Sequence, residues 1–150
     1  MYYFELPEAL LSKAIPANLK LVEEICEEYS LEDHFGTIST ATQEFLNVIK
    51  KTTKGEDVTV TTGYILENDQ LFAHFEVKGT IISLPELFEE GKEFNPIKTI
   101  LMLTDDLLYT EDNKGISFGF HVKQEVQERI IQLSTKESTP KIDKKWQKRI

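Results

Sequence analysis

Three polar residues, each four positions after the last, are the clearest candidates for chemistry in this chain: Gln43, Asn47 and Lys51. Residues four apart share one face of an α-helix, so two amides and an ammonium group would form a polar stripe. An apolar stripe beside it comprises Ala41, Phe45, Val48 and Ile49. Such a helix buries its apolar face and exposes the polar stripe either to solvent or to a groove, where the stripe can bind a polar ligand.

Other reactive side chains lack the partners that catalysis or metal binding requires. The three histidines, which have no metal-ligand spacing, are His34, His74 and His121. Ser83 has no Gly-x-Ser-x-Gly setting and is expected to cap a helix. Asp105 and Asp106 are expected to be solvated acids between a helix and a strand. Cys26 is the single cysteine, which excludes an intramolecular disulfide, and we expect it to act as a small buried apolar residue.

The composition predicts one globular domain followed by a basic tail. The 150 residues carry a net charge of −9, but residues 134–150 hold six basic and two acidic side chains. We therefore expect a domain over residues 1–133 and a solvating tail over 134–150, with Trp146 as the one hint that the tail docks. The acidic body disfavours nucleic acid. Short apolar runs and the absence of a basic leader predict a soluble, cytoplasmic protein without a membrane partner.

The elements that would position the polar stripe begin with a change of periodicity. Two short strands are predicted, Met1 to Leu6 and Ser12 to Ile15, and Pro16 is expected to end the second because proline cannot donate to a strand ladder. A helix follows, whose inward face is expected to hold Leu19, Val22, Ile25, Cys26 and Tyr29. The helix with the polar stripe comes next and ends near Gly55.

Two hairpins are predicted from two-residue alternation. The strands of the first have inward positions at Val58, Val60, Thr62 and Tyr64, and at Leu71, Ala73, Phe75 and Val77. The second runs from Leu107 to Thr110 and back through Ile116, Phe118, Phe120 and Val122. Each pattern indicates an antiparallel pair with one apolar face.

Short helices fill the remaining segments. A capping box at Ser83 to Glu86 begins one helix, and Gly91 closes it. Asn95 and Pro96 cap the next, in which Ile97, Ile100, Leu101 and Leu103 are expected to face inward. A last helix is predicted from Val126, Ile130 and Leu133. The element order predicts an α+β fold: a two-layer sandwich with helices on one face of a mixed or antiparallel sheet.

The element pattern over about residues 12–122 resembles the histidine-kinase-like ATPase domain, in the small stand-alone form of anti-sigma-factor serine kinases. The resemblance rests on the run Ala14-Ile15-Pro16-Ala17, the Thr42 to Asn47 helix, the first hairpin and the segment from Ile97 to Asp105. It implies the corresponding two-layer fold. It also implies a nucleotide groove beside the helix that carries Asn47.

The motifs that bind nucleotide in that family are degraded in this chain. The resemblance places Gln43 where the family has a glutamate base, and Asn47 where an asparagine holds magnesium. An amide cannot act as a general base near neutral pH. Gly79 survives from the second motif, whereas Val77 falls at the position of the adenine-binding aspartate. Phe94 to Ile97 replaces the glycine-rich phosphate loop, and proline lacks the amide donor that such a loop needs.

Two functions of different class follow. The first is a non-catalytic regulatory module that binds a protein in bacterial signalling or anti-sigma-type regulation, with no cofactor and no catalytic residue. Its partner would be a regulatory protein or a second copy in a homodimer, and the Lys136 to Arg149 tail would contribute electrostatics. The alternative is a divergent serine protein kinase or ATPase that binds Mg-ATP. In that case Gln43, Asn47 and Gly79 would contact the nucleotide, and Asn47 would hold the metal.

Overall fold

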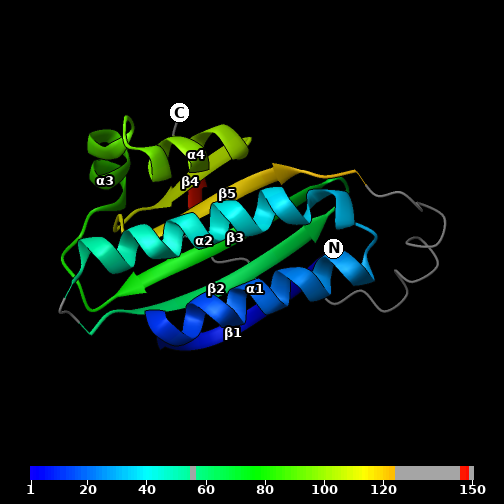
Figure 1. The fold of residues 1–150 in the computed structure, drawn as a ribbon, viewed down its shortest axis with the longest axis horizontal. Helices are drawn as coiled ribbons and strands as arrows, with labels where there is room; N and C mark the ends of the chain where they lie inside the picture. The colour runs from blue at the N-terminus through cyan, green and yellow to red at the C-terminus, as the bar shows by residue number, and fades with distance from the viewer. Residues whose placement is uncertain (55–56, 124–145, 149–150) are drawn as a thin grey trace.

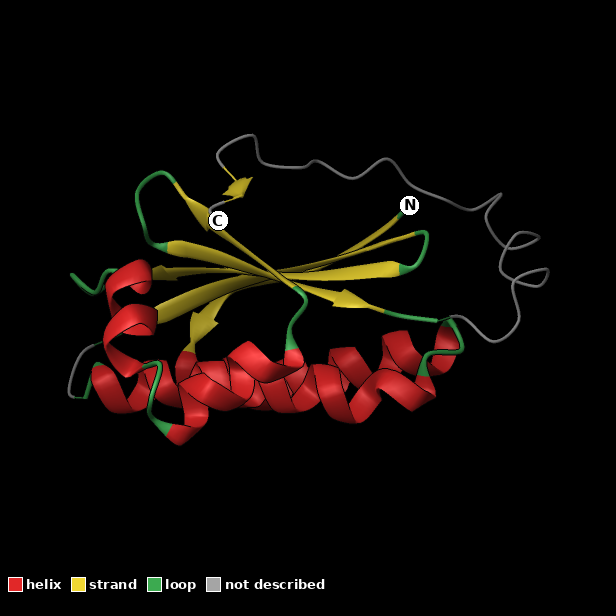
Figure 2. Cartoon of the chain, turned by 90° about the horizontal axis from the view of Figure 1, so that it is seen from above, coloured by secondary structure: helices red, strands yellow, loops and turns green. Residues whose placement is uncertain are grey.

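The computed structural model describes residues 1–54, 57–123 and 146–148, which form a sheet layer and a helix layer. Figure 2 shows all the helices on one face of the sheet, and in Figure 1 the two long helices run side by side across that face. The helices are α1 (Leu11–Glu28), the short η1 (Glu32–His34), α2 (Phe35–Thr52), α3 (Leu84–Gly91) and α4 (Asn95–Leu103). The strands are β1 (Tyr2–Leu10), β2 (Thr59–Glu67), β3 (Gln70–Lys78), β4 (Asp106–Thr110), β5 (Gly115–His121) and β6 (Trp146–Lys148). The predicted α+β two-layer sandwich is confirmed.

The strand order in the sheet is β1-β2-β3-β5-β4-β6, and every neighbouring pair is antiparallel. Both predicted hairpins are present as β2–β3 and β4–β5. Asn68 takes a positive φ of 53° in the tight β2–β3 turn, where Glu67 pairs with Gln70. The sheet centre is formed by β3 and β5, because β5 rather than β4 pairs with β3.

Phe45 of α2 lies at the centre of the core between the two layers. Its ring centroid is 5.1 Å from that of Phe75 on β3 and 5.3 Å from that of Phe118 on β5. All three side chains are fully buried, and so is Ile49 one turn along α2. The predicted apolar face of this helix is therefore correct. Rings packed at tilted and edge-on angles add to the stabilisation from their burial.

The start of α1 differs from the sequence prediction. Residues 12–15 belong to the helix, so the predicted second strand is wrong, and Pro16 lies inside α1. A proline there removes one helical N–H donor. Side-chain amides donate to carbonyls of the same turn, from Asn18 Nδ2 to Ala14 O at 2.9 Å and from Gln43 Nε2 to Ile15 O at 3.0 Å. These two bonds, the first within α1 and the second from α2, help to hold a proline-containing turn that local sequence disfavours.

Two expected inward positions face solvent instead. Leu19 on α1 is 39% exposed, and Asn18 takes the buried position beside it. Leu101 on α4 is 41% exposed, whereas Ile97 and Ile100 are buried. Each helix packs through a narrower apolar face than its sequence offers, because one side of each helix has no neighbouring layer.

The two short helices begin close to the predicted residues, with different capping. Ser83 occupies the N-cap of α3, but its hydroxyl makes no capping hydrogen bond. The N-cap of α4 is Phe94, so Asn95 and Pro96 form the first turn instead of preceding it. Gly91 closes α3 as expected.

The end of the chain adds a strand that the sequence did not predict. Trp146–Lys148 forms β6, which pairs with β4 at one edge of the sheet. These three residues fall within the segment expected to be a tail, and they extend the sheet. The expected division of the chain at residue 134 stays a prediction. The helix predicted from Val126, Ile130 and Leu133 lies outside the described residues. Of the helices in the described part of the chain, none combines the length and apolar character that crossing a bilayer requires.

Candidate functional site

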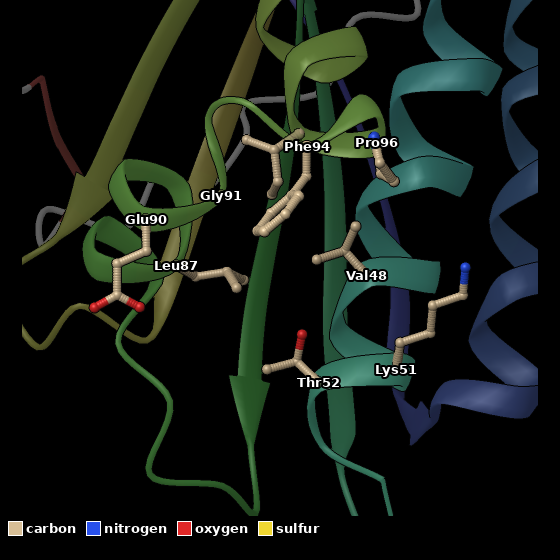
Figure 3. Close-up of a pocket in the computed structure, with 9 residues that line it drawn as sticks. Val48, Lys51, Thr52, Leu87, Glu90, Gly91, Phe94 and Pro96 are labelled. Atoms are coloured by element: carbon tan, nitrogen blue, oxygen red, sulfur yellow. The ribbon is translucent and has the colours of Figure 1, made fainter.

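A cavity of about 270 Å³ lies between the C-terminal half of α2 and the segment that contains α3 and α4. Figure 3 shows Val48 of α2 and Leu87 of α3 pointing toward one another, with the Phe94 ring beside them. The lining comprises Val48, Lys51, Thr52, Leu87, Glu90, Gly91, Phe94, Pro96 and Ile97. We refer to this cavity as the α2–α3 groove. Its floor is apolar and its polar groups lie on the rim.

The apolar floor follows from the helix faces that meet there. Ile97 is buried, whereas Phe94 is 69% exposed and forms a hydrophobic edge of the groove. Gly91 closes α3 where a side chain would crowd the groove, since a Cβ atom there would lie 3.0 Å from Ile97 Cγ1. The apolar surface therefore continues from the floor of the groove to solvent.

Opposite charges stand on the two walls of the groove. Lys51 extends from α2 and Glu90 from α3, and Figure 3 shows both charged ends directed away from the cavity, so the charges lie on its outer rim, at exposed residues. Within the described residues neither of them has an ion-pair partner. Glu89, one position earlier on α3, is instead paired with Lys92 at 2.8 Å.

The wall formed by α3 is held in place by the β4–β5 turn. Lys114 donates from Nζ to the carbonyl oxygens of Thr80 and Ile82, which precede α3. The amide of Leu84 donates to Asn113 O at 3.0 Å. An ammonium group that bonds to two carbonyls is a charge-assisted clamp, so the distance between α3 and α2 depends on this turn.

The three residues predicted to contact nucleotide are not brought together at the groove. The amide of Gln43 is directed at the backbone of α1, and Asn47 is exposed on the outer side of α2. Gly79 follows β3 with a φ of +90°, and a Cβ atom there would collide with Asp57 O, so the backbone itself explains this glycine. None of the three is among the groove's lining residues. Their role toward nucleotide stays a prediction.

The other degraded motif positions have structural roles. Val77 is buried in the core, and its amide donates to Lys114 O at 2.9 Å. Pro96 occupies the first turn of α4, where a phosphate-binding loop would present a free amide. The groove thus has few donors for a phosphate chain, and the Val77 position belongs to the core instead of the groove lining.

A buried polar network that sequence reasoning missed connects α1 to the sheet. The Tyr64 hydroxyl donates to Asn18 Oδ1 at 2.7 Å, and Asn18 Nδ2 donates to Thr62 Oγ1 at 3.2 Å. Asn18 and Tyr64 are fully buried, and burial raises the pKa of the tyrosine hydroxyl. The sequence did contain an indication of this network. Asn18 lies four residues after Ala14 and four before Val22, which places it on the inward face of the helix.

The remaining candidate residues stabilise the fold. His34 accepts a hydrogen bond at Nε2 from the Lys123 amide at 2.9 Å, and Asp105 accepts one from the His121 amide at 2.6 Å. Burial, with a smaller effect of the Glu32 charge, raises the pKa of Cys26 to about 11, so its thiol is protonated at neutral pH. The described residues contain no group of histidine, cysteine and acidic side chains that could hold a metal ion.

A second cavity, of about 350 Å³, lies between the start of α1 and the end of α2. Its charged lining residues are Lys50, Lys54 and Asp57. Thr53, which also lines it, bonds through its hydroxyl to Ile49 O at 2.6 Å. Its polar groups are thus mainly exposed side chains at helix ends, and we assign it no ligand.

Compared with known proteins, the chain matches no protein-family model and has no significant match among curated proteins.

Proposed function

We propose that this chain is a non-catalytic regulatory module that binds another protein, on a degenerate histidine-kinase-like ATPase scaffold. One observation carries the proposal: the α2–α3 groove has an apolar floor, and its lining includes Phe94 and Pro96 of the segment that replaces the phosphate loop. An exposed apolar cavity rimmed by polar residues is typical of a surface that binds a partner. The regulatory context, bacterial signalling or anti-sigma-type control, comes from the resemblance.

The positions of the candidate catalytic groups support the absence of catalysis. Gln43 is an amide in place of a base, and it bonds to the backbone of α1. Glu44, the neighbouring acid, is about 100° around the helix from Gln43 and does not line the groove. A general base must come within hydrogen-bond reach of the group that it deprotonates. Neither side chain meets this requirement for a ligand in the groove.

Thermal unfolding with and without magnesium and ATP tests the proposal. A ligand at about 100 times its dissociation constant stabilises a protein by about 2.7 kcal/mol, which is readily measured as a rise in melting temperature. We expect no rise with millimolar Mg-ATP. We also expect affinity purification from the native cell, without nucleotide, to retain a specific protein.

The alternative function makes the opposite prediction for Asn47. If Mg-ATP raises the melting temperature and Asn47→Ala abolishes the rise, the chain is a nucleotide-binding enzyme and our proposal is wrong. Lys50→Ala is the matched control, because Lys50 is exposed on the same helix and lines the other cavity. It should leave any nucleotide effect unchanged.

A further inference from the structure

We propose that the α2–α3 groove binds an amphipathic helix whose apolar stripe has basic residues along one flank and acidic residues along the other. This inference rests on the proposed protein-binding function and assigns the site and the chemistry of the partner. Three observations carry it: the apolar floor, its extension along α4, and the opposite charges on the two walls.

The apolar surface is longer than the cavity. Phe94 and Leu101 are seven residues apart on and just before α4, so they share a face with Ile97 between them. Phe94 is 69% exposed and Leu101 41% exposed. Seven residues of helix span about 10 Å. The floor and this stripe together form an elongated apolar track, which suits the spaced apolar side chains of a helix.

The size of the cavity also favours side chains from a larger partner. Its volume of about 270 Å³ lies just below the range of about 300–1,000 Å³ that is typical for pockets enclosing drug-sized ligands. Val48 and Leu87 face one another across the opening (Figure 3), which leaves room for apolar side chains inserted between them. A partner helix would anchor such side chains in the groove and remain outside it.

The charges beside the groove determine which flank of the bound helix is basic and which is acidic. On the α3 wall, Glu90 follows Glu86 by one turn, and both are exposed. On the α2 wall, Lys51 supplies an ammonium group without an ion-pair partner in the described residues. A bound helix would place basic residues beside Glu90 and acidic residues beside Lys51. This arrangement also fixes the direction in which the helix lies, because reversing it would place like charges together.

Fluorescence anisotropy with three labelled 14-residue peptides tests the inference. All three carry the same leucine and phenylalanine stripe at positions i, i+3, i+4 and i+7. The mixed peptide has arginine on one flank and glutamate on the other, the basic peptide has arginine on both, and the acidic peptide has glutamate on both. We expect the mixed peptide to bind the intact chain about tenfold more tightly than either of the others at low salt.

Single charge reversals should redirect this preference. Lys51→Glu makes both walls acidic, so the basic peptide should become the tightest ligand. Glu90→Lys makes both walls basic, so the acidic peptide should become the tightest. A reversal on α1, Lys20→Glu, is the matched control and should leave the order unchanged, since Lys20 is exposed on a helix outside the groove. Equal affinities for the three peptides, or an order that neither reversal changes, would overturn the inference.

The apolar contribution is tested separately. Phe94→Ser should weaken the binding of all three peptides by about tenfold, because aromatic side chains dominate the energy of such contacts. Ile81→Ser is the control, since Ile81 is 96% exposed and does not line the groove. Competition by Mg-ATP would show a nucleotide site and contradict the inference. A dimer of the intact chain that Phe94→Ser dissociates would assign the groove to a second copy and also contradict it.

Failure of this inference can be distinguished from failure of the proposed function. A native partner that is retained equally by the unaltered chain and by the Phe94→Ser and Lys51→Glu variants would show that protein binding occurs elsewhere. The groove assignment would then be wrong, while the module would still act by binding a protein.

Discussion

His74 is a residue whose surroundings change its ionisation. It lies on β3 with its ring 6.3 Å from that of Phe72 in a stacked arrangement. Both ring nitrogens are shielded from solvent, although the residue is only partly buried. Burial lowers the pKa of His74 to about 4. The sequence could place this histidine on a strand, but its desolvation depends on neighbours that sequence spacing does not identify.

This pKa predicts a loss of stability at mildly acidic pH. The unfolded chain, with a histidine pKa of about 6.5, binds a proton before the folded chain does. The free energy of unfolding is therefore unaffected by His74 above about pH 6.5 and falls as the pH drops toward 4, by about 3 kcal/mol. Urea unfolding at several pH values measures it. His74→Phe should remove this part of the pH dependence, whereas His121→Gln, at an exposed position, should retain it. If the free energy of unfolding falls with pH as steeply in His74→Phe as in the unaltered chain, the prediction is wrong.

At the scale of elements, the network of Asn18, Thr62 and Tyr64 fixes α1 against β2. It lies within the core, and its hydrogen bonds join residues 44 and 46 positions apart in sequence. Gln43 makes a second connection, from α2 to the backbone of α1. Side-chain amides thus set how the two long helices sit relative to each other and to the sheet. A ligand site was predicted from the polar stripe of Gln43, Asn47 and Lys51. Of these three residues, Gln43 contributes to this packing.

The network makes a testable prediction about stability. Tyr64→Phe removes the donor to Asn18 Oδ1 and leaves a buried acceptor, which should cost about 1–3 kcal/mol in the free energy of unfolding. Asn18→Leu alone should cost at least as much, because it leaves the tyrosine hydroxyl buried without this acceptor. The double variant should lose less than the sum of the two, since replacing both partners removes the unmet hydrogen bond. Additive losses in urea unfolding would argue against direct coupling.

At the scale of the whole molecule, β6 covers one edge of the sheet. Its three residues pair with Leu108, Tyr109 and Thr110 of β4, which lie much earlier in the sequence. An uncovered edge strand exposes backbone donors and acceptors and favours association with other chains. The end of the chain therefore contributes to the fold as well as to its charge, which the composition of residues 134–150 did not reveal.

Truncation after Lys145 tests the role of β6. We expect the melting temperature to fall by about 2–4 °C for each kcal/mol of lost pairing, and the truncated chain to self-associate more readily. Truncation after Lys148 keeps the strand and is the matched control, which should melt like the full chain. An unchanged melting temperature in the shorter variant would mean that the tail acts only through its charge, as the sequence predicted.

The sequence by itself determined those helices and strands that can be recognised from the spacing of apolar residues within one segment. Alternating residues predicted both hairpins, and the spacing of Phe45 and Ile49 predicted the buried face of α2, because side-chain direction follows from the period of a strand or helix. Only the tertiary structure decided the pairing of β3 with β5, the helical state of residues 12–15 and the acceptor of Gln43. It also decided where the α2–α3 groove lies. These features depend on contacts between residues far apart in sequence, which can override local propensity and which no local period encodes.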